Sequence, residues 1–154
     1  MTVQGATKTS ASEFVEFFAA GWKLGARDAE GFFRHFGPRM HPDTVLVQPI
    51  ASPARGPGAL KELFGPLFTA MPDLHGTITR WGETADGVFI ELVLSGHLGR
   101  KSLEWTVVDR IILEDGLIRE RRSYFHPAPV LRAVASRPYA ARALLSAVFR
   151  RSRG

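Results

Sequence analysis

The stretch from Leu103 to His126 constrains the fold more than any other part of the chain, because its pattern is typical of a long β-hairpin. Its centre, Asp115-Gly116, supplies residues that tolerate positive φ in a tight turn, and both flanks carry β-branched and aromatic residues. Alternate residues of the first strand form an apolar face that only Asp109 interrupts: Leu103, Trp105, Val107, Ile111 and Leu113. The pattern therefore predicts two antiparallel strands with one carboxylate on the inner face.

Asp109 is the most informative single residue, because its neighbours decide where it lies. Burial of each large apolar neighbour contributes about 1.5 to 3 kcal/mol, so the whole face turns inward and Asp109 turns with it. An unpaired carboxylate there costs several kcal/mol, so Asp109 is expected to be protonated, hydrogen-bonded or paired with a cation. A two-residue turn puts it opposite Arg122 and a three-residue loop opposite Arg121, so a structural ion pair is the alternative to a functional site.

The rest of the chain predicts helices first and strands later. Capping-box spacing at Ser10 and Glu13 starts a helix from about Ser12 to Gly25, and Asp28 can cap a second, short helix. Helical spacing after Pro57 continues to Met71, with a kink expected at Gly65-Pro66. The predicted strands are Thr44–Pro49, His75–Glu83 and Val88–Leu98, and helical sequence resumes after Pro127 with a break at Arg137-Pro138.

Composition and charge narrow the function classes. The 154 residues suit one domain, and without cysteine neither a disulfide nor a thiolate zinc site is available. The net charge of +5 is unevenly spread: residues 1–120 carry 12 basic and all 15 acidic residues, whereas 8 arginines and no acid follow from Arg121 onward. The basic charge belongs to the C-terminal part, so it argues against nucleic-acid binding by the main domain. No apolar run could span a membrane and the N-terminus lacks a secretion signal, so a cytoplasmic protein is expected.

Four stretches together resemble the NTF2-like superfamily, and within it the SnoaL-like and ketosteroid-isomerase-like branch. They are Val47-Gln48-Pro49 with the helix from Gly58, Met71-Pro72-Asp73-Leu74, Ser95 to Lys101, and Val108 to Phe125. The resemblance implies an α+β (cystatin-like) cone, in which a curved, mostly antiparallel sheet wraps around N-terminal helices. It also implies an apolar pocket and, commonly, a homodimer. We expect residues 1–127 to form this domain and 128–154 a basic helical extension.

The resemblance carries over to single residues unevenly. The position of the ketosteroid isomerase general base holds Gln48, which cannot take up a proton, whereas Asp109 matches the protonated aspartic acid of the oxyanion hole. In polyketide cyclases an aspartate ends the last strand, where this chain has His126, a candidate acid or base. Epoxide hydrolases of the fold use an Asp-Arg-Asp set, and Ser123 at the last-strand position argues against that activity.

The sequence thus supports two hypotheses. The first is a pocket that binds a small, apolar, oxygenated molecule, either as a binding protein or as an isomerase-like or cyclase-like enzyme with Asp109 and His126 as catalytic candidates. Its predicted ligand-binding residues are Phe18, Trp22, Gln48, Phe68, His97, Trp105 and Tyr124. The alternative is a noncatalytic dimeric interaction module with a basic C-terminal tail. No cofactor is expected, and the five histidines show no spacing typical of a metal site.

Overall fold

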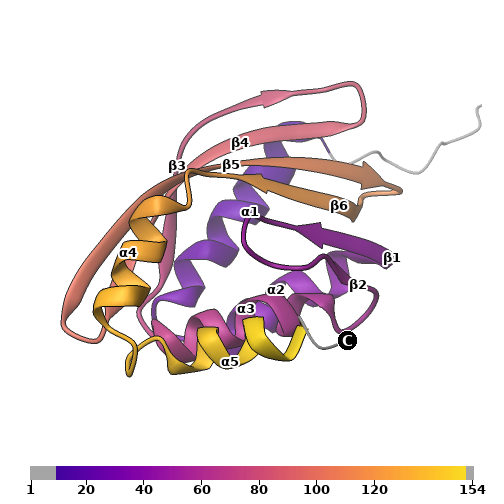
Figure 1. Cartoon of the computed structure of the whole chain (residues 1–154). Coiled ribbons are helices and arrows are strands. Elements are labelled where there is room, and N and C mark those ends of the chain that lie inside the picture. Colours follow the sequence, from indigo (N-terminus) through magenta and orange to yellow (C-terminus); the bar gives the residue numbers. More distant parts are fainter. Residues whose placement is uncertain (1–9, 152–154) are drawn as a thin grey trace, which may run out of the picture.

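The computed structural model describes residues 10–151, which form helices packed into the hollow of one curved sheet (Figure 1). The helices are α1 (Ala11–Gly25), α2 (Ala29–Phe36), a short 3-10 turn (Gly37–Arg39), α3 (Ala59–Ala70), α4 (Ala128–Ser136) and α5 (Arg142–Arg151). The strands are β1 (Met40–Val47), β2 (Ala54–Arg55), β3 (His75–Glu83), β4 (Gly87–Leu98), β5 (Lys101–Glu114) and β6 (Leu117–Tyr124). This is the α+β plan predicted from the sequence.

The sheet has six strands in the order β2-β1-β6-β5-β4-β3. All neighbouring pairs are antiparallel except β1 and β6, which run parallel. The predicted hairpin is confirmed: Glu114 pairs with Leu117, and both Asp115 and Gly116 have positive φ, as a two-residue primed turn requires. β1 begins earlier than predicted, at Met40, and Pro49 lies beyond its end.

Capping explains where the first helices begin. Ser10 and Glu13 form the predicted capping box of α1, and the Asp28 side chain accepts a hydrogen bond from the Gly31 N–H at the start of α2. α3 runs past Pro66 to Ala70, so the proline lies inside the helix.

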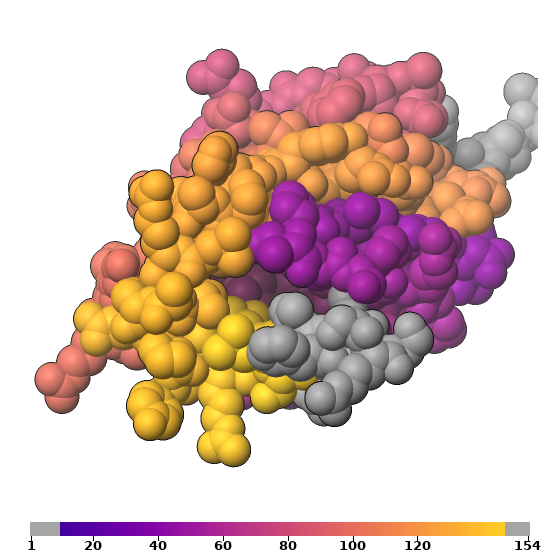
Figure 2. Space-filling model, viewed as in Figure 1, coloured from indigo at the N-terminus to yellow at the C-terminus, as the bar shows by residue number. Residues whose placement is uncertain are grey.

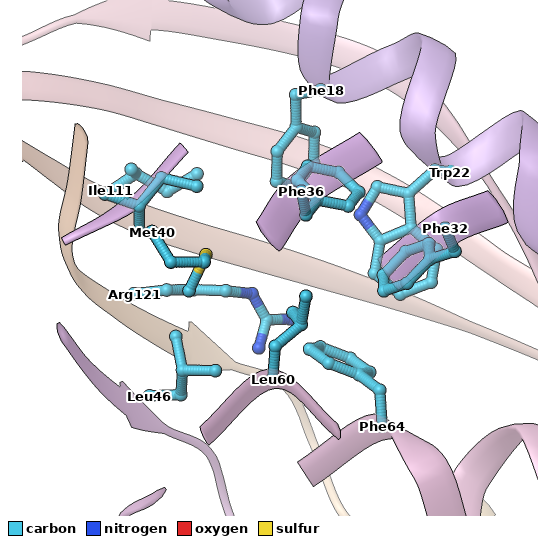
Figure 3. Close-up of a pocket in the computed structure, with 11 residues that line it drawn as sticks. Phe18, Trp22, Phe32, Phe36, Met40, Leu46, Leu60, Phe64, Ile111 and Arg121 are labelled. Carbon is cyan, nitrogen blue, oxygen red and sulfur yellow. The ribbon is translucent and has the colours of Figure 1, made fainter. Parts of the chain in front are cut away.

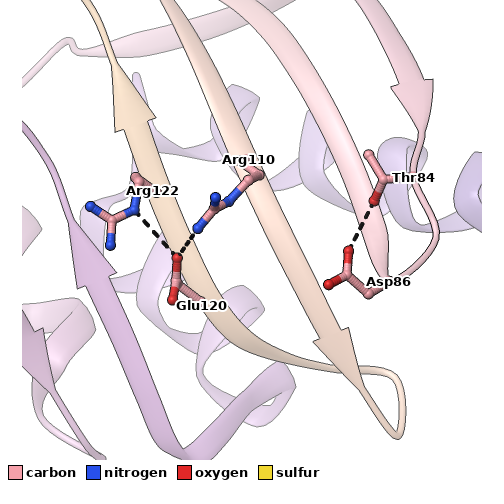
Figure 4. Close-up of polar contacts among 5 residues, drawn as sticks. All are labelled: Thr84, Asp86, Arg110, Glu120 and Arg122. Carbon is pink, nitrogen blue, oxygen red and sulfur yellow. Dashed lines mark hydrogen bonds and ion pairs between the residues drawn. The ribbon is translucent and has the colours of Figure 1, made fainter.

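At the turn of the β3–β4 hairpin the Thr84 hydroxyl donates a hydrogen bond to Asp86 at 3.2 Å (Figure 4).

Aromatic side chains from the three N-terminal helices fill the hollow of the sheet. Trp22 and Phe32 are each about 1% exposed and their rings meet edge to face, with centroids 5.1 Å apart. Phe64 of α3 contacts both rings, at 5.6 and 5.5 Å. This cluster holds α1, α2 and α3 together over the inner face of the sheet.

The C-terminal extension is two helices, separated at the predicted Arg137-Pro138 break. α4 packs against β5 and α5 packs against α3, so the pair closes one end of the cone (Figure 1). Arg132, Arg137 and Arg142 of this segment are exposed, while the end of the predicted basic tail, Arg153, lies outside the described residues. No helix within residues 10–151 has the length and apolar character that a membrane span requires.

Candidate ligand-binding site

Asp109 is fully buried on the inner face of β5 and accepts two hydrogen bonds. Arg121 Nε donates to its Oδ2 at 2.8 Å, and the Ser123 hydroxyl donates to its Oδ1 at 2.6 Å. The two cross-strand registers predicted for Asp109 were wrong: it pairs with Ser123, because an irregularity near Arg119 shifts the ladder by one residue. Arg121 therefore reaches Asp109 diagonally, from the same face of the neighbouring strand.

The Arg121 guanidinium is held on several sides and still has an unused donor. Arg121 is 6% exposed, and its guanidinium carbon lies 5.0 Å from the centre of the Phe64 ring, within cation–π range. Nη2 donates to the Ser123 hydroxyl at 3.3 Å, whereas the buried Nη1 has no hydrogen-bond partner. Leaving a buried donor unsatisfied costs about 1 to 3 kcal/mol. Arg121 Nη1 therefore lacks a hydrogen-bond acceptor.

Arg121 lies between two cavities, of which the inner one is too small for a ligand. It has a volume of about 20 Å³ and is lined, apart from Arg121, by apolar side chains that include Phe18, Trp22 and Ile111 (Figure 3). A water molecule needs two or more polar partners, and this space offers only the guanidinium. We treat the inner cavity as a packing gap beside Arg121.

The larger cavity, of about 200 Å³, is bounded by the sheet, α3 and the two C-terminal helices. Trp105, Arg121 and Ser123 line it from the sheet, and Gln48 from the segment after β1. The apolar side chains that close it on the helical side are Phe64 and Leu67 of α3, Val130, Leu131 and Val134 of α4, and Leu144 and Leu145 of α5. Figure 2 shows the surface hollowed between α4, α5 and the segment after β1.

Two features mark this larger cavity as a site. Trp105 is 8% exposed, and its indole Nε1 has no hydrogen-bond partner, so the cavity is bordered by two residues with orphan N–H donors, Trp105 and Arg121. At its rim Ile50 has a φ of 69°, a strained conformation for a β-branched residue, and its side chain is 49% exposed. An apolar cavity with a few unsatisfied polar groups is the usual form of a small-molecule site.

Only some of the predicted site residues come together here. Gln48 and Trp105 line the larger cavity, and Phe18 and Trp22 line the inner one. Asp109 lines neither cavity and touches the site only through Arg121 and Ser123. Phe68 is buried in the aromatic cluster, with its ring 4.9 Å from that of Phe32.

The two histidines and the tyrosine lie away from Asp109. His126 is exposed after the end of β6, where its Nδ1 accepts from the Ala128 N–H at 3.3 Å. Tyr124 is 48% exposed on the outer face of the sheet. His97 is exposed at another hollow, where its Nδ1 lies 2.6 Å from Asp73 Oδ2 and its backbone N–H donates to Asp73 Oδ1 at 2.8 Å. The structure thus does not bring His126 or His97 to the buried pair.

Asp73 is a carboxylate whose pKa the fold shifts. Partial burial acts to raise the pKa of Asp73, but the hydrogen bonds from the His97 ring and backbone outweigh it, so the pKa lies below its usual value. The pair ties the connection between α3 and β3 to β4, and its side chains are about half exposed. We assign it a structural role.

The outer face of the sheet carries a second charged cluster, shown in Figure 4. Glu120 of β6 accepts hydrogen bonds from Arg110 and from Arg122, and its bond with Arg110 raises the pKa of the Arg110 guanidinium. Two exposed aromatic residues lie near this cluster. Phe89 is 42% exposed and pairs across the strands with Arg110, and Tyr124 pairs with Val108. This face is polar at its centre with large apolar side chains beside it.

The structure gives Arg121 and Ser123 a larger part than the sequence predicts. The sequence predicts Arg121 only as a possible partner that neutralises Asp109, and Ser123 only as a position without a carboxylate. Their i, i+2 spacing on a predicted strand does put both side chains on one face, which is a usable signal. The α4 and α5 residues that line the cavity carry no such signal. Among residues 10–151, no three His, Asp or Glu side chains gather as a metal ion would require.

The helix-filled cone and its cavity define the NTF2-like class of proteins. The sequence matches the SnoaL-like domain family over residues 11–121, and the chain belongs to that family. A search of curated protein sequences found no significant match.

Solved structures with the same fold share little sequence with this chain. A protein from Jannaschia sp. CCS1, provisionally described as a SnoaL-like polyketide cyclase, is 19% identical, with a TM-score of 0.71 over 87% of this chain and 97% of its own. A protein from Catenulispora acidiphila with a ketosteroid isomerase-like fold, in complex with trimethylamine, is 20% identical (TM-score 0.68, 80% and 93%). An LEH-like epoxide hydrolase of M. tuberculosis is 19% identical (TM-score 0.64, 84% and 92%). At these identities the likeness shows the fold.

Proposed function

We propose that this protein binds a small, largely apolar molecule that carries a hydrogen-bond-accepting oxygen, and that the larger cavity is the binding site. The observation that carries the proposal is the pair of buried residues, Arg121 and Trp105, that each keep an unpartnered N–H donor beside an apolar space of about 200 Å³. An oxygen acceptor of a bound molecule would satisfy donors that otherwise cost free energy. The oxygenated substrates implied by the names of a polyketide cyclase and an epoxide hydrolase among the relatives agree with this class.

Within this proposal Asp109 is a positioning residue. Both of its oxygens already accept hydrogen bonds, from Arg121 and Ser123, and Asp109 lines neither cavity, so it is engaged within the protein and does not face a ligand. Its bond to Nε fixes the guanidinium and leaves Nη1 for the ligand. The role predicted from the resemblance, Asp109 as acid or hydrogen-bond donor to a carbonyl, would require this pair to separate.

Binding is favoured over proton-transfer catalysis by what lines the cavity. Among the described lining residues there is no Asp, Glu, His, Lys or Tyr, and Gln48 cannot exchange a proton. The Arg121 and Trp105 donors could stabilise a developing oxyanion as an isomerase or cyclase needs, but no general base accompanies them. His126 would have to move from its exposed position to serve as one.

The experiment is a titration with a compact aromatic ketone, methyl naphthyl ketone, followed by tryptophan fluorescence and isothermal calorimetry. We expect saturable binding to the wild-type protein and a loss of about tenfold or more in Arg121→Met, since a hydrogen bond from a charged donor is worth about 1.5 to 3 kcal/mol. Trp105→Phe, read by calorimetry, should weaken binding less. Arg122→Met on the outer face is the matched control. Equal affinities in the Arg121 and Arg122 variants would contradict the proposal.

A second candidate function is a homodimer formed through the outer face of the sheet. The exposed Phe89 and Tyr124 beside the Arg110–Glu120–Arg122 cluster favour it, because phenylalanine, tyrosine and arginine side chains are enriched in protein interfaces. Sedimentation velocity should show a dimer that Phe89→Glu converts to monomer. A wild-type protein that stays monomeric at tens of micromolar would remove this candidate. Contact of the basic C-terminal segment with an acidic partner stays a prediction of the sequence.

A further inference from the structure

We infer that the larger cavity selects an uncharged oxygen acceptor, such as the carbonyl of a ketone or ester, against a carboxylate, and that Asp109 sets this selection. The inference rests on the proposed function and names the ligand class of the same site. It depends on the Asp109–Arg121 pair, which at 2.8 Å and with both side chains almost fully buried acts as one neutral unit.

The charge of the lining decides between the two kinds of oxygen. Arg121 is the only charged side chain among the described residues that border this cavity, and Asp109 directly behind it already balances its charge. A carboxylate in the cavity would leave one uncompensated negative charge in a largely apolar enclosure, close to that of Asp109. Burying such a charge costs far more than burying a carbonyl. A neutral acceptor gains the same N–H donors without that cost.

The size and shape of the cavity set the rest of the class. Cavities of about 150 Å³ lined by apolar side chains are known to bind benzene, so about 200 Å³ accommodates one ring or a compact fused ring system with its carbonyl. The lining residues Phe64, Leu67, Val107 and Val134 offer such a ring only apolar contact. We therefore expect compact ring ketones or esters as ligands.

Two probes with the same ring system test the inference: methyl naphthyl ketone and naphthoate, near neutral pH, where naphthoate is ionised. Wild-type protein should bind the ketone at least about tenfold more tightly. Asp109→Asn keeps an oxygen that can accept from Arg121 Nε but removes the balancing charge, so Arg121 becomes an unpaired cation. This variant should bind naphthoate more tightly than wild type, and the preference should move toward naphthoate by about tenfold or more.

The control is Glu120→Gln, which removes a carboxylate from an arginine on the outer face of the same two strands. It should leave both affinities unchanged. Failure of both probes to bind wild-type protein would overturn the proposed function itself. Naphthoate bound by wild-type protein as tightly as the ketone would overturn only the charge selection.

Two further outcomes concern Asp109. An unchanged preference in folded Asp109→Asn, with native near-UV circular dichroism, would refute its assigned part. If that variant does not fold, the wild-type ratio of the two affinities still decides the ligand class. Ser123→Ala then tests the role of the charge, because it removes one of the two hydrogen bonds to Asp109 but no charge. This variant should keep the preference for the ketone, and a reversal of the preference would contradict the inference.

Discussion

Replacing Asp109 by leucine should destabilise the fold strongly, because it leaves the buried Arg121 guanidinium without its carboxylate partner. The change removes the acceptor of Arg121 Nε and of the Ser123 hydroxyl in a place with no solvent access. Nη1 already lacks a partner, so the guanidinium would keep only its 3.3 Å bond to Ser123 and the Phe64 ring. Breaking a buried pair in this way costs about 3 to 5 kcal/mol, out of a total stability of about 5 to 15 kcal/mol.

A double-mutant cycle with Arg121→Met measures the interaction energy between Asp109 and Arg121 separately from their contacts with other residues. Arg121→Met alone leaves the Asp109 carboxylate unpaired and should cost a similar amount. Together, the two apolar substitutions remove both charges and fill the space, so the double variant should recover most of the loss. Urea unfolding followed by circular dichroism measures each free energy. With an m-value of about 1 to 3 kcal/mol/M, the Asp109→Leu midpoint should fall by roughly 2 M.

The cycle has a matched control and a clear contrary result. Glu120→Leu breaks an arginine–carboxylate pair on the outer face of the same strands, where solvent screens the charges, and should shift the midpoint much less. If Asp109→Leu costs the same whether residue 121 is arginine or methionine, the two side chains are not coupled. The account of Asp109 as the group that holds Arg121 would then be wrong.

Three further predictions test the packing and the cavity. Gly87→Ala should lower the melting temperature sharply, because a Cβ there would lie 1.8 Å from the Ile111 carbonyl oxygen, whereas Gly82→Ala meets nothing within 4 Å and should not. Asp73→Asn should cost less than about 1 kcal/mol at neutral pH. Folding lowers the pKa of Asp73, so the wild-type protein should exceed the variant in free energy of unfolding at pH values above the ordinary pKa of an aspartate. This stability difference should vanish in urea titrations as the pH falls through the lowered pKa. Leu144→Trp should fill part of the cavity and weaken ketone binding in calorimetry, with unfolding unchanged.

Local patterns were enough to predict most of the fold. The Asp115-Gly116 turn, the capping box at Ser10 and the aromatic spacing in the first two helices are each determined by neighbours in sequence, and the structure has all three. The inward position of Asp109 follows from the same alternation. These features depend on few long-range contacts, which is why one sequence suffices to predict them.

The register of the last hairpin could not be predicted in the same way. The irregularity near Arg119 shifts every pair beyond it, so Asp109 pairs with Ser123 and not with either arginine. A bulge is selected by packing across the whole sheet and leaves little trace in composition. With this register Arg121 meets Asp109 diagonally, and Arg121 also lines both cavities.

The cavity itself depends on contacts between distant segments, and this explains why its chemistry had to come from the structure. Its wall combines the sheet, α3 and two C-terminal helices that the sequence suggested only as a basic extension. A carboxylate on an apolar strand face predicts a buried polar group with a partner. It does not predict which of the two, Asp109 or Arg121, lines the cavity. Here Arg121 lines the cavity and Asp109 does not, so in the proposed site a ligand would meet a donor whose charge Asp109 already balances. Exchanging the two positions would turn the same pair of residues into a site for cationic or proton-donating ligands.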